Sequence, residues 1–328
     1  MNLSTKSTTL LSPYSFLNSR LIKNDCIECY QKTLALQGMG TTAAIQYSKG
    51  MYSDSHHILT FPKLLINKFS MVSNVIKQGK FSDSHYIFCF PAVEENILIN
   101  GKEINHNGLY VITPEEILHS RNISEYSLFI IVVHQKELEK YLDHSSINQL
   151  RYSPENIRLG KTYLPYLIET KNKLRSNLTW LYENYPLMNR QALLDTEEHI
   201  LQCLEKLVRV SPQRKNIIIT PNSRKNIVDR CTNYINQTND IEFNIAQLAA
   251  HAFCSIRSLE YAFKSILGVT PKQFLILRRM HLIRETIKAN NHYLINAILD
   301  NYGVINRSRF KKEFFQMFGE QLSELAKK

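Results

Sequence analysis

Hydrophobic and polar positions along this chain change their spacing three times, and each change marks a different kind of structure. Between about residues 43 and 133, short apolar runs alternate with turn residues, as in HYIFCFPAV, GLYVITP and YSLFIIVVH. Runs of this kind at roughly ten-residue spacing are typical of a small antiparallel barrel or sandwich. Between two of them, Asn100-Gly101 fits a two-residue hairpin turn, because Asn and Gly both tolerate a positive φ angle.

Two long helices are predicted over residues 163–185 and 188–208, where leucines recur at intervals of three, four and seven. Pro186 separates the two stretches. The pattern leaves two partners open for their apolar faces. The helices either pack on the barrel or pack on the same pair in a second copy of the chain.

The third change produces one short pattern that occurs twice near the end of the chain. The copies read NIAQLAAHAFCSIRSLEYAFKSILGVTP and INAILDNYGVINRSRFKKEFFQMFGEQ. Each copy predicts a short helix, a tight turn and a second helix that ends at a glycine. This is the layout of a helix-turn-helix unit, in which the second helix enters the major groove of DNA.

Single residues define the ends of these helices. Asn244 with Gln247 fits a capping box for the first short helix. Ser255 and Asn306 are expected to cap the two second helices. Phe253 stands in the first turn, where a glycine or another small residue is usual.

A further helix joins the two units. Thr270-Pro271 predicts its start, and its apolar stripe continues to about Ala289. At 1.5 Å of rise per residue this helix is roughly 28 Å long. One turn of B-DNA advances about 34 Å, so one chain can read two successive major grooves.

Outward-facing residues of the two second helices are the expected DNA contacts. Arg257 is expected to donate to guanine through two hydrogen bonds, and Tyr261 to reach a base edge or a phosphate. In the second unit, arginines are expected to read bases and lysines to contact phosphates. The alternative is that all four cations there make only nonspecific phosphate contacts. The full predicted set is Ser255, Arg257, Ser258, Glu260, Tyr261, Lys264, Lys272, Arg307, Ser308, Arg309, Lys311 and Lys312.

The distribution of charge agrees with this interpretation. The formal net charge is +11 at pH 7. Residues 1–210 hold 22 Lys+Arg against 20 Asp+Glu, a net of +2, and residues 211–328 hold 18 against 9, a net of +9. The excess positive charge therefore lies in the part that carries the repeated pattern, where it favours binding to a polyanion.

The six cysteines are scattered, and only Cys26 and Cys29 form a CxxC pair. No second pair or histidine cluster completes a zinc site beside them. The N-terminal segment is too polar for a signal peptide, and the longest apolar run, residues 128–133, is too short to span a bilayer. We therefore expect free thiols, no metal, no cofactor, no membrane contact and a cytoplasmic location.

From about Asn226 to Lys328 the chain resembles the AraC/XylS family of bacterial transcription regulators. The motif residues in the first unit and the connecting helix are Leu248, Ala249, Ser255, Arg257, Leu259, Phe263, Gly268, Thr270, Pro271 and Arg279, and the pattern YG….S.F…F…FG follows from Tyr302 to Gly319. Leu299, Val304 and Leu322 depart from it, where the family has a small Ala, a Phe and a Pro. The resemblance implies two helix-turn-helix units joined by a long helix, and RNA polymerase as a partner.

The N-terminal part is similar to the cupin-like sensory domains of that family, and FCFPAVEENILINGKEI is weakly similar to the ethanolamine-utilisation regulator branch. Five aromatic residues are predicted to line a pocket for an apolar or aromatic effector: Phe69, Tyr86, Phe88, Phe90 and Tyr110. The alternative is that these rings simply fill the core.

A cupin-type metal enzyme needs two histidines one residue apart, with a carboxylate and a third histidine. His56 and His57 are adjacent, so they are expected to point to opposite faces of a strand. The remaining candidates each stand alone: His85, His106, His119 and His134. We therefore expect no enzyme activity.

Together these patterns predict an α+β chain. A cupin-like antiparallel β-barrel is expected over residues 1–150, a helical dimerisation segment over 151–210, a linker over 211–222, and an all-α domain over 223–328. The predicted function is that of a homodimeric, sequence-specific transcription regulator that binds double-stranded DNA. It is expected to be an activator whose N-terminal domain modulates its activity and takes a small-molecule effector. The alternatives are a cupin-type metal enzyme with a DNA-binding tail and a nonspecific nucleic-acid-binding protein.

Overall fold

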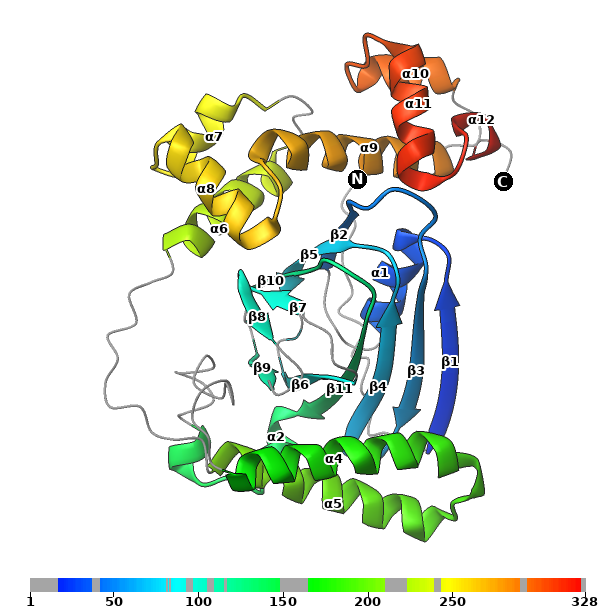
Figure 1. Cartoon of the computed structure of the whole chain (residues 1–328), viewed down its shortest axis with the longest axis vertical. Coiled ribbons are helices and arrows are strands. Elements are labelled where there is room, and N and C mark those ends of the chain that lie inside the picture. Colours follow the sequence, from blue (N-terminus) through cyan, green and yellow to red (C-terminus); the bar gives the residue numbers. More distant parts are fainter. Residues whose placement is uncertain are drawn as a thin grey trace, which may run out of the picture.

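Two antiparallel β-sheets face each other in the N-terminal half of the chain (Figure 1). The computed structural model describes residues 17–36, 42–80, 82, 84–92, 97–104, 109–114, 117–147, 165–209, 223–238, 243–289 and 294–325. The six-stranded sheet has the order β1 (Asn18–Asn24), β3 (Asp54–Thr60), β4 (Leu64–Met71), β11 (Tyr126–His134), β6 (His85–Pro91) and β9 (Tyr110–Ile112). The five-stranded sheet has the order β2 (Thr42–Gln46), β5 (Val75–Lys80), β10 (Ile117–Asn122), β7 (Ile97–Ile99) and β8 (Lys102–Ile104).

The predicted two-residue hairpin joins β7 to β8. Ile99 pairs with Lys102, and the two residues between them have φ angles of 50° at Asn100 and 72° at Gly101. These left-handed angles match the right-handed twist of the strands, which is why Asn-Gly is favoured there.

Helices cover the outer face of the six-stranded sheet. The short α2 (Gln135–Leu138) follows β11, and α4 (Pro165–Asn184), η2 (Tyr185–Leu187) and α5 (Arg190–Arg209) form a helical hairpin below the sheet in Figure 1. Leucines of α4 and α5 share one buried cluster with Phe88 and Phe129 of the sheet. The sequence left open whether these helices pack on the barrel or on a second copy of the chain, and in the structure they pack on the six-stranded sheet.

Inside the double sheet, α1 (Ile27–Leu36) contributes Tyr30 and Leu34 to a second buried cluster. Alternate residues of one strand therefore enter different clusters. On β6, Ile87 and Cys89 face this interior, whereas Phe88 faces the helical hairpin. Both faces of the six-stranded sheet are thus apolar.

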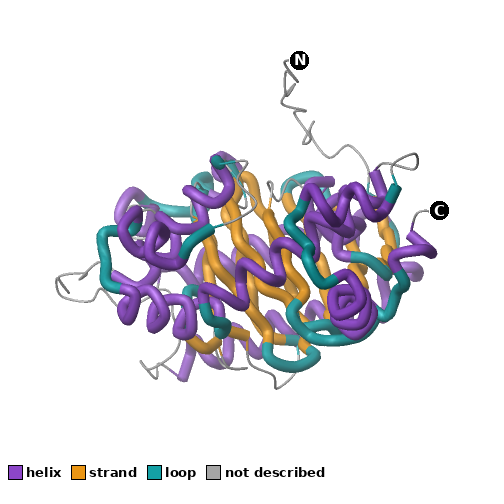
Figure 2. The backbone as a smooth tube through the Cα atoms, turned by 90° about the horizontal axis from the view of Figure 1, so that it is seen from above, coloured by secondary structure: helices purple, strands orange, loops and turns teal. Residues whose placement is uncertain are grey.

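The C-terminal half consists of helices, which Figure 2 shows lying over the strands. They are α6 (Ser223–Gln237), α7 (Ile245–His251), α8 (Ile256–Leu267), α9 (Pro271–Ala289), α10 (Ile295–Asn301), α11 (Arg307–Phe318) and α12 (Leu322–Leu325). The α+β class expected from the sequence is confirmed. Residues 211–222, the predicted linker, lie outside the described residues. No helix within the described ranges combines the length and apolar character needed to cross a membrane.

The predicted helix caps are present. Ser255 Oγ accepts from the Ser258 N–H at 3.1 Å, and Asn306 Oδ1 accepts from the Arg309 N–H at 2.9 Å. Asn244 also caps α7, but it accepts from the N–H of Ala246.

Thr270 caps α9 as predicted, and Gln273, which the sequence analysis did not identify, completes a capping box there. Thr270 Oγ1 accepts from the Gln273 N–H at 3.2 Å, and Gln273 Oε1 accepts from the Thr270 N–H at 3.0 Å. This reciprocal pair satisfies donors that a helix start leaves without partners.

The two halves share a hydrophobic cluster as well as polar contacts. Ile45 of β2 and Ile76 of β5 pack with Val228 of α6 and Ile266 of α8. Because these side chains leave the outer face of the five-stranded sheet, the C-terminal half covers that face. From one side to the other, the layers are the α4–α5 hairpin, the six-stranded sheet, the five-stranded sheet and the C-terminal helices (Figure 1).

The turn between the helices of each repeat adopts a left-handed backbone. Phe253 has φ 54° in the first repeat, and Gly303 has φ 64° in the second. An alanine at Gly303 should therefore destabilise the protein by about 1–2 kcal/mol, measured by urea unfolding. Phe253→Ala is the matched control, because that position already carries a side chain at a positive φ, and it should change stability by much less. Equal effects of the two substitutions would contradict this account.

Candidate nucleic-acid interface and interior cavity

Buried residues fix the orientation of α8 and α11. In α8, Leu259, Phe263 and Ile266 are buried against α6, α7 and α9. In α11, Phe310, Phe314 and Phe318 form the buried stripe expected from their spacing of four residues. The remaining face of each helix therefore points away from its core.

All twelve residues predicted to contact DNA are exposed. They lie on α8, on α11, at the serine cap of α8 and at the start of α9. The structure thus presents them on surfaces open to a ligand.

One residue near this surface was missed by the sequence analysis. The Arg224 guanidinium of α6 lies 4.4 Å from the centre of the Tyr261 ring on α8. A cation over an aromatic face is a favourable contact, and it adds a positive charge beside the exposed face of α8. No sequence signal could find it, because the two residues are far apart in the chain.

In α11 the two arginines already have carboxylate partners. Arg307 contacts Asp300 Oδ1 at 2.6 Å, and Arg309 contacts Glu313 Oε1 at 2.7 Å. The hydrogen bond that Arg309 donates to Glu313 raises the pKa of Arg309. Because solvent screens exposed ion pairs of this kind, both guanidinium groups can exchange these partners for a phosphate or a guanine at little cost.

A cavity of about 40 Å³ lies between the sheets of the N-terminal half. Its wall is mostly aliphatic and includes Tyr30 and Leu34 of α1. Roughly three water molecules would fill such a volume. The wall also contains Lys77, which is only 5% exposed.

Aromatic rings surround the ammonium group of Lys77. Its Nζ donates to the Tyr126 hydroxyl, and it lies 4.7 Å from the ring centre of Phe69 and 5.2 Å from that of Tyr30. Burial lowers the pKa of Lys77 to about 7, although the nearby Asp54 charge opposes this shift. Near neutral pH the group therefore exchanges readily between its charged and neutral forms.

The predicted pocket residues are only partly in this wall. Phe69 lines the cavity, and Tyr110 belongs to the surrounding interior cluster. The prediction was wrong for Tyr86, Phe88 and Phe90, which face the α4–α5 hairpin. The next residues along β6, Ile87 and Cys89, line the cavity instead. Because β6 is apolar on both faces, its sequence gives no indication of which face points inward.

The histidines do not form a cupin-type metal site among the described residues. His56 is buried beside Asp54, whereas His57 lies half-buried on the opposite face, as expected. His85 and His134 lie ring to ring at 5.0 Å, and His119 contacts Asp229 of α6. His106 lies outside the described residues.

The expectation of free thiols is wrong for two cysteines. Cys26 and Cys29 form a disulfide, and with Asp25 they are the one group in the described ranges that could hold a metal ion. The spacing of a CxxC pair is compatible with a disulfide and with two free thiols, so the sequence alone does not distinguish these two states. The free cysteines are Cys89, Cys203, Cys231 and Cys254.

Comparison with known proteins supports the assignment of the C-terminal half. Residues 248–328 match the family model described as a helix-turn-helix domain. The probable transcriptional regulator LumQ of Photobacterium leiognathi is 28% identical over 119 residues, which are 36% of this chain and 45% of LumQ. The chain thus spans less than half of the length of this relative.

Solved structures give more distant likenesses. The AraC-like transcriptional activator CuxR has a TM-score of 0.44 at 9% identity, covering 81% of this chain and 95% of CuxR. ToxT from Vibrio cholerae O395 has a TM-score of 0.29 at 13% identity, covering 80% and 97%. The cupin domain of Schizosaccharomyces pombe Cnp3 has a TM-score of 0.23 at 12% identity, covering 28% and 74%. All three scores are low, and these likenesses do not bear on the function.

The buried amine of Lys77 predicts a pH dependence of stability. Its pKa is lower in the folded chain than in the unfolded one, so the unfolded chain binds more protons between about pH 7 and 10. Stability therefore rises with pH in that window. Lys77→Met should remove this pH-dependent contribution. The free energy of unfolding of the variant minus that of the wild type should therefore be about 2 kcal/mol larger at pH 7 than at pH 9.

Urea unfolding at the two pH values measures this difference. Two ionisable groups near Lys77 do not titrate in the folded protein between these pH values, because burial raises the pKa of Asp54 to about 6 and that of Cys89 to about 12. Parallel stability profiles for the two proteins would show that Lys77 is charged in the folded state.

Proposed function

We propose that this chain, whose residues 248–328 match a helix-turn-helix domain model, is a sequence-specific DNA-binding transcription regulator of the AraC/XylS type. In this proposal α8 and α11 enter two successive major grooves of one duplex. The observation that carries it is the pairing of two helix-turn-helix units on the single helix α9, each with its basic second helix exposed.

The length of α9 supports binding in two successive grooves. It has 19 residues, which corresponds to roughly 28 Å at 1.5 Å per residue. Because a continuous helix is stiff, it limits the separation of the two units to a distance near one turn of B-DNA, about 34 Å.

Contacts between the halves support modulation by the N-terminal half. His119 of β10 contacts Asp229 of α6 at 2.5 Å, and Gln78 of β5 donates to Thr232 of the same helix. A change between the sheets can therefore reach α6, which packs against recognition helix α8. We assign residues 17–147 to this sensory role, and residues 223–325 to DNA binding.

The effector proposed for this half is a mostly apolar molecule of only a few non-hydrogen atoms, because the cavity it would occupy has a volume of about 40 Å³. A group that accepts a hydrogen bond from Lys77 would orient it, because ligand sites commonly pair an apolar wall with a few polar groups. Such a molecule would also contact Phe69 in the wall.

The remaining parts of the proposal follow from the family resemblance. We propose that the protein is an activator that contacts RNA polymerase, acts in the cytoplasm where the DNA is, and has no enzyme activity. We also propose a homodimer. Trp180 and Leu187 are exposed apolar residues at the end of the α4–α5 hairpin, and they support a contact between the two copies of the chain there.

Base recognition by the two helices can be tested directly. A target duplex would first be selected from a random library with the full-length protein. Arg257→Ala and Arg309→Ala should each weaken binding to that target by about 1–3 kcal/mol and relax discrimination at one base position. Lys311→Ala should weaken binding to all duplexes alike and reduce the dependence of affinity on salt. Fluorescence anisotropy with target and scrambled duplexes measures both effects.

Arg20→Ala is the matched control, because Arg20 is an exposed arginine on the edge strand β1, outside the proposed DNA interface and the proposed dimer contact. Its affinity should equal that of the wild type. If Arg257→Ala and Arg309→Ala lose the same free energy on target and scrambled DNA, the protein is a nonspecific nucleic-acid binder. Loss confined to one of the two would limit base recognition to a single groove.

A further inference from the structure

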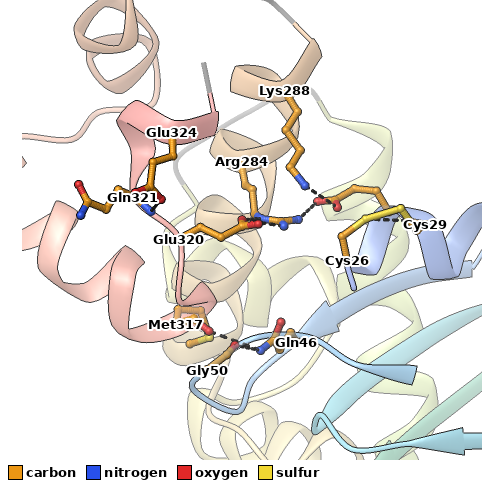
Figure 3. A network of polar contacts seen from close by, with 11 residues as sticks. Cys26, Cys29, Gln46, Gly50, Arg284, Lys288, Met317, Glu320, Gln321 and Glu324 are labelled. Atoms are coloured by element: carbon orange, nitrogen blue, oxygen red, sulfur yellow. Dashed lines mark hydrogen bonds and ion pairs between the residues drawn. A yellow bond between two sulfur atoms is a disulfide. The ribbon is translucent and has the colours of Figure 1, made fainter. Parts of the chain in front are cut away.

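One buried arginine joins three segments of the chain at the boundary between the two halves. Arg284 of α9 donates to Glu28 of α1 through Nη1 and to Glu320, just after α11, through Nε at 3.0 Å and Nη2 at 2.8 Å. Lys288, one turn further along α9, lies 3.4 Å from the second oxygen of Glu28. Figure 3 shows Arg284 between Glu320 and the CxxC turn of α1. We call these four residues the Arg284 clamp.

The clamp depends on close placement of its charges. The Arg284 side chain is 3% exposed, so its guanidinium has little water to replace a missing carboxylate. Burial raises the pKa of Glu28, but the hydrogen bond and charge of Arg284 outweigh it and hold that pKa below the ordinary value. Both groups are therefore charged at neutral pH, and a displacement of Glu28 would leave Arg284 with a single carboxylate.

The Cys26–Cys29 disulfide encloses Glu28 in its turn. The bond joins residues three apart with a Cα–Cα distance of 5.4 Å, and Glu28 lies between them in the first turn of α1. The Cys29 N–H also points to Cys26 Sγ at 3.3 Å. The position of the Glu28 carboxylate is thus set by a turn that a covalent bond holds closed.

Reduction would change both the geometry and the charge of this turn. It opens the ring, and it leaves Cys26 at the beginning of a ten-residue helix, where the helix dipole and the Cys29 N–H favour a thiolate. A second negative charge would then lie near Glu28 and compete with it for the cations of α9. Cys26 is buried, but Cys29 is half-buried and offers a point of attack.

We propose that Cys26 and Cys29 form a reversible thiol–disulfide site whose state sets the strength of the Arg284 clamp. The reagent class is a dithiol or a thiol–disulfide exchange protein. A thiolate of the reagent attacks one cysteine sulfur, forms a mixed disulfide and releases the other cysteine as a thiolate. The second reagent thiol then attacks the reagent sulfur of the mixed disulfide and releases the remaining cysteine, so that two cysteine thiols and one oxidised dithiol result. Two electrons and two protons pass to the protein in each cycle of reduction.

The site goes beyond the proposed function, because it concerns the connection between the halves and not the DNA sequence that is bound. The coupling between the disulfide and the clamp is reciprocal. If the disulfide strengthens the clamp, then the clamp stabilises the disulfide by the same factor. Breaking the clamp by substitution must therefore make the disulfide easier to reduce.

The first experiment measures this coupling in the full-length protein. Samples are equilibrated with defined ratios of reduced and oxidised dithiothreitol, alkylated, and analysed by mass spectrometry of the peptide that contains Cys26 and Cys29. Arg284→Met should shift the disulfide-to-dithiol ratio toward the dithiol by about fivefold or more, the usual lower range of such coupling. Arg279→Met, a neighbouring arginine of α9 outside the clamp, should shift it by less than about twofold. Equal ratios in wild type and Arg284→Met would overturn the proposal.

The second experiment needs no clamp variant, so it stands even if Arg284→Met fails to fold. Hydrogen exchange of the full chain is compared with and without dithiothreitol. Reduction should speed exchange in α1, in α9 around Arg284 and near Glu320, and the Cys26→Ser, Cys29→Ser double variant should show no response to the reductant. Unchanged exchange in the reduced wild type would overturn the proposal. So would stoichiometric zinc bound at Asp25, Cys26 and Cys29 in oxidising buffer, because the pair would then be a metal site.

Discussion

The packing of α9 is the constraint on which the rest of the structure depends. Phe274 and Leu277 near its start belong to the core of the first helix-turn-helix unit, whereas Ile283 and Ile287 near its end belong to the core of the second. Neither unit can move along or around α9 without exposing one of these cores. Because burial of a large apolar side chain contributes about 1.5–3 kcal/mol, the helix fixes both recognition surfaces at once. The separation of those surfaces is therefore a property of one continuous helix.

Local rules explain what the sequence could predict. The caps at Ser255 and Asn306 and the phenylalanine stripe of α11 depend only on residues within a few positions, so spacing alone identifies them. The Asn100-Gly101 hairpin is predictable for the same reason. Exposure of all the proposed DNA contacts follows from the stripes, since a residue opposite a buried face must point to solvent.

The interior of the sheets could not be predicted in the same way. A strand that is covered on both sides has no polar face, and a shift of one residue reverses every side chain. This is why aromatic residues at even positions of β6 were expected in the cavity, although its wall contains Ile87 and Cys89. Lys77 gave no signal either, because a lysine in a strand is normally expected at the surface. Contacts across long stretches of chain, such as Arg284 with Glu28, have no local signature at all.

The two halves are coupled at different places by different forces, and this determines which connection can be switched. Near α6 and α8 the boundary combines the apolar contact of Ile45 and Ile76 with hydrogen bonds from β5 and β10. An apolar contact of this kind changes little with solution conditions other than temperature and cosolvent. At the far end of α9 the Arg284 ion pairs lie alongside hydrogen bonds from Gly50 and Gln46 to carbonyl groups at the end of α11. The ionic part of this connection responds strongly to the position of one carboxylate. The apolar contact near α6 and α8 would hold the first helix-turn-helix unit in place. A change at Arg284 would alter how far the second unit can move. In the proposed complex, regulation from the N-terminal half would then act mainly on the groove assigned to α11.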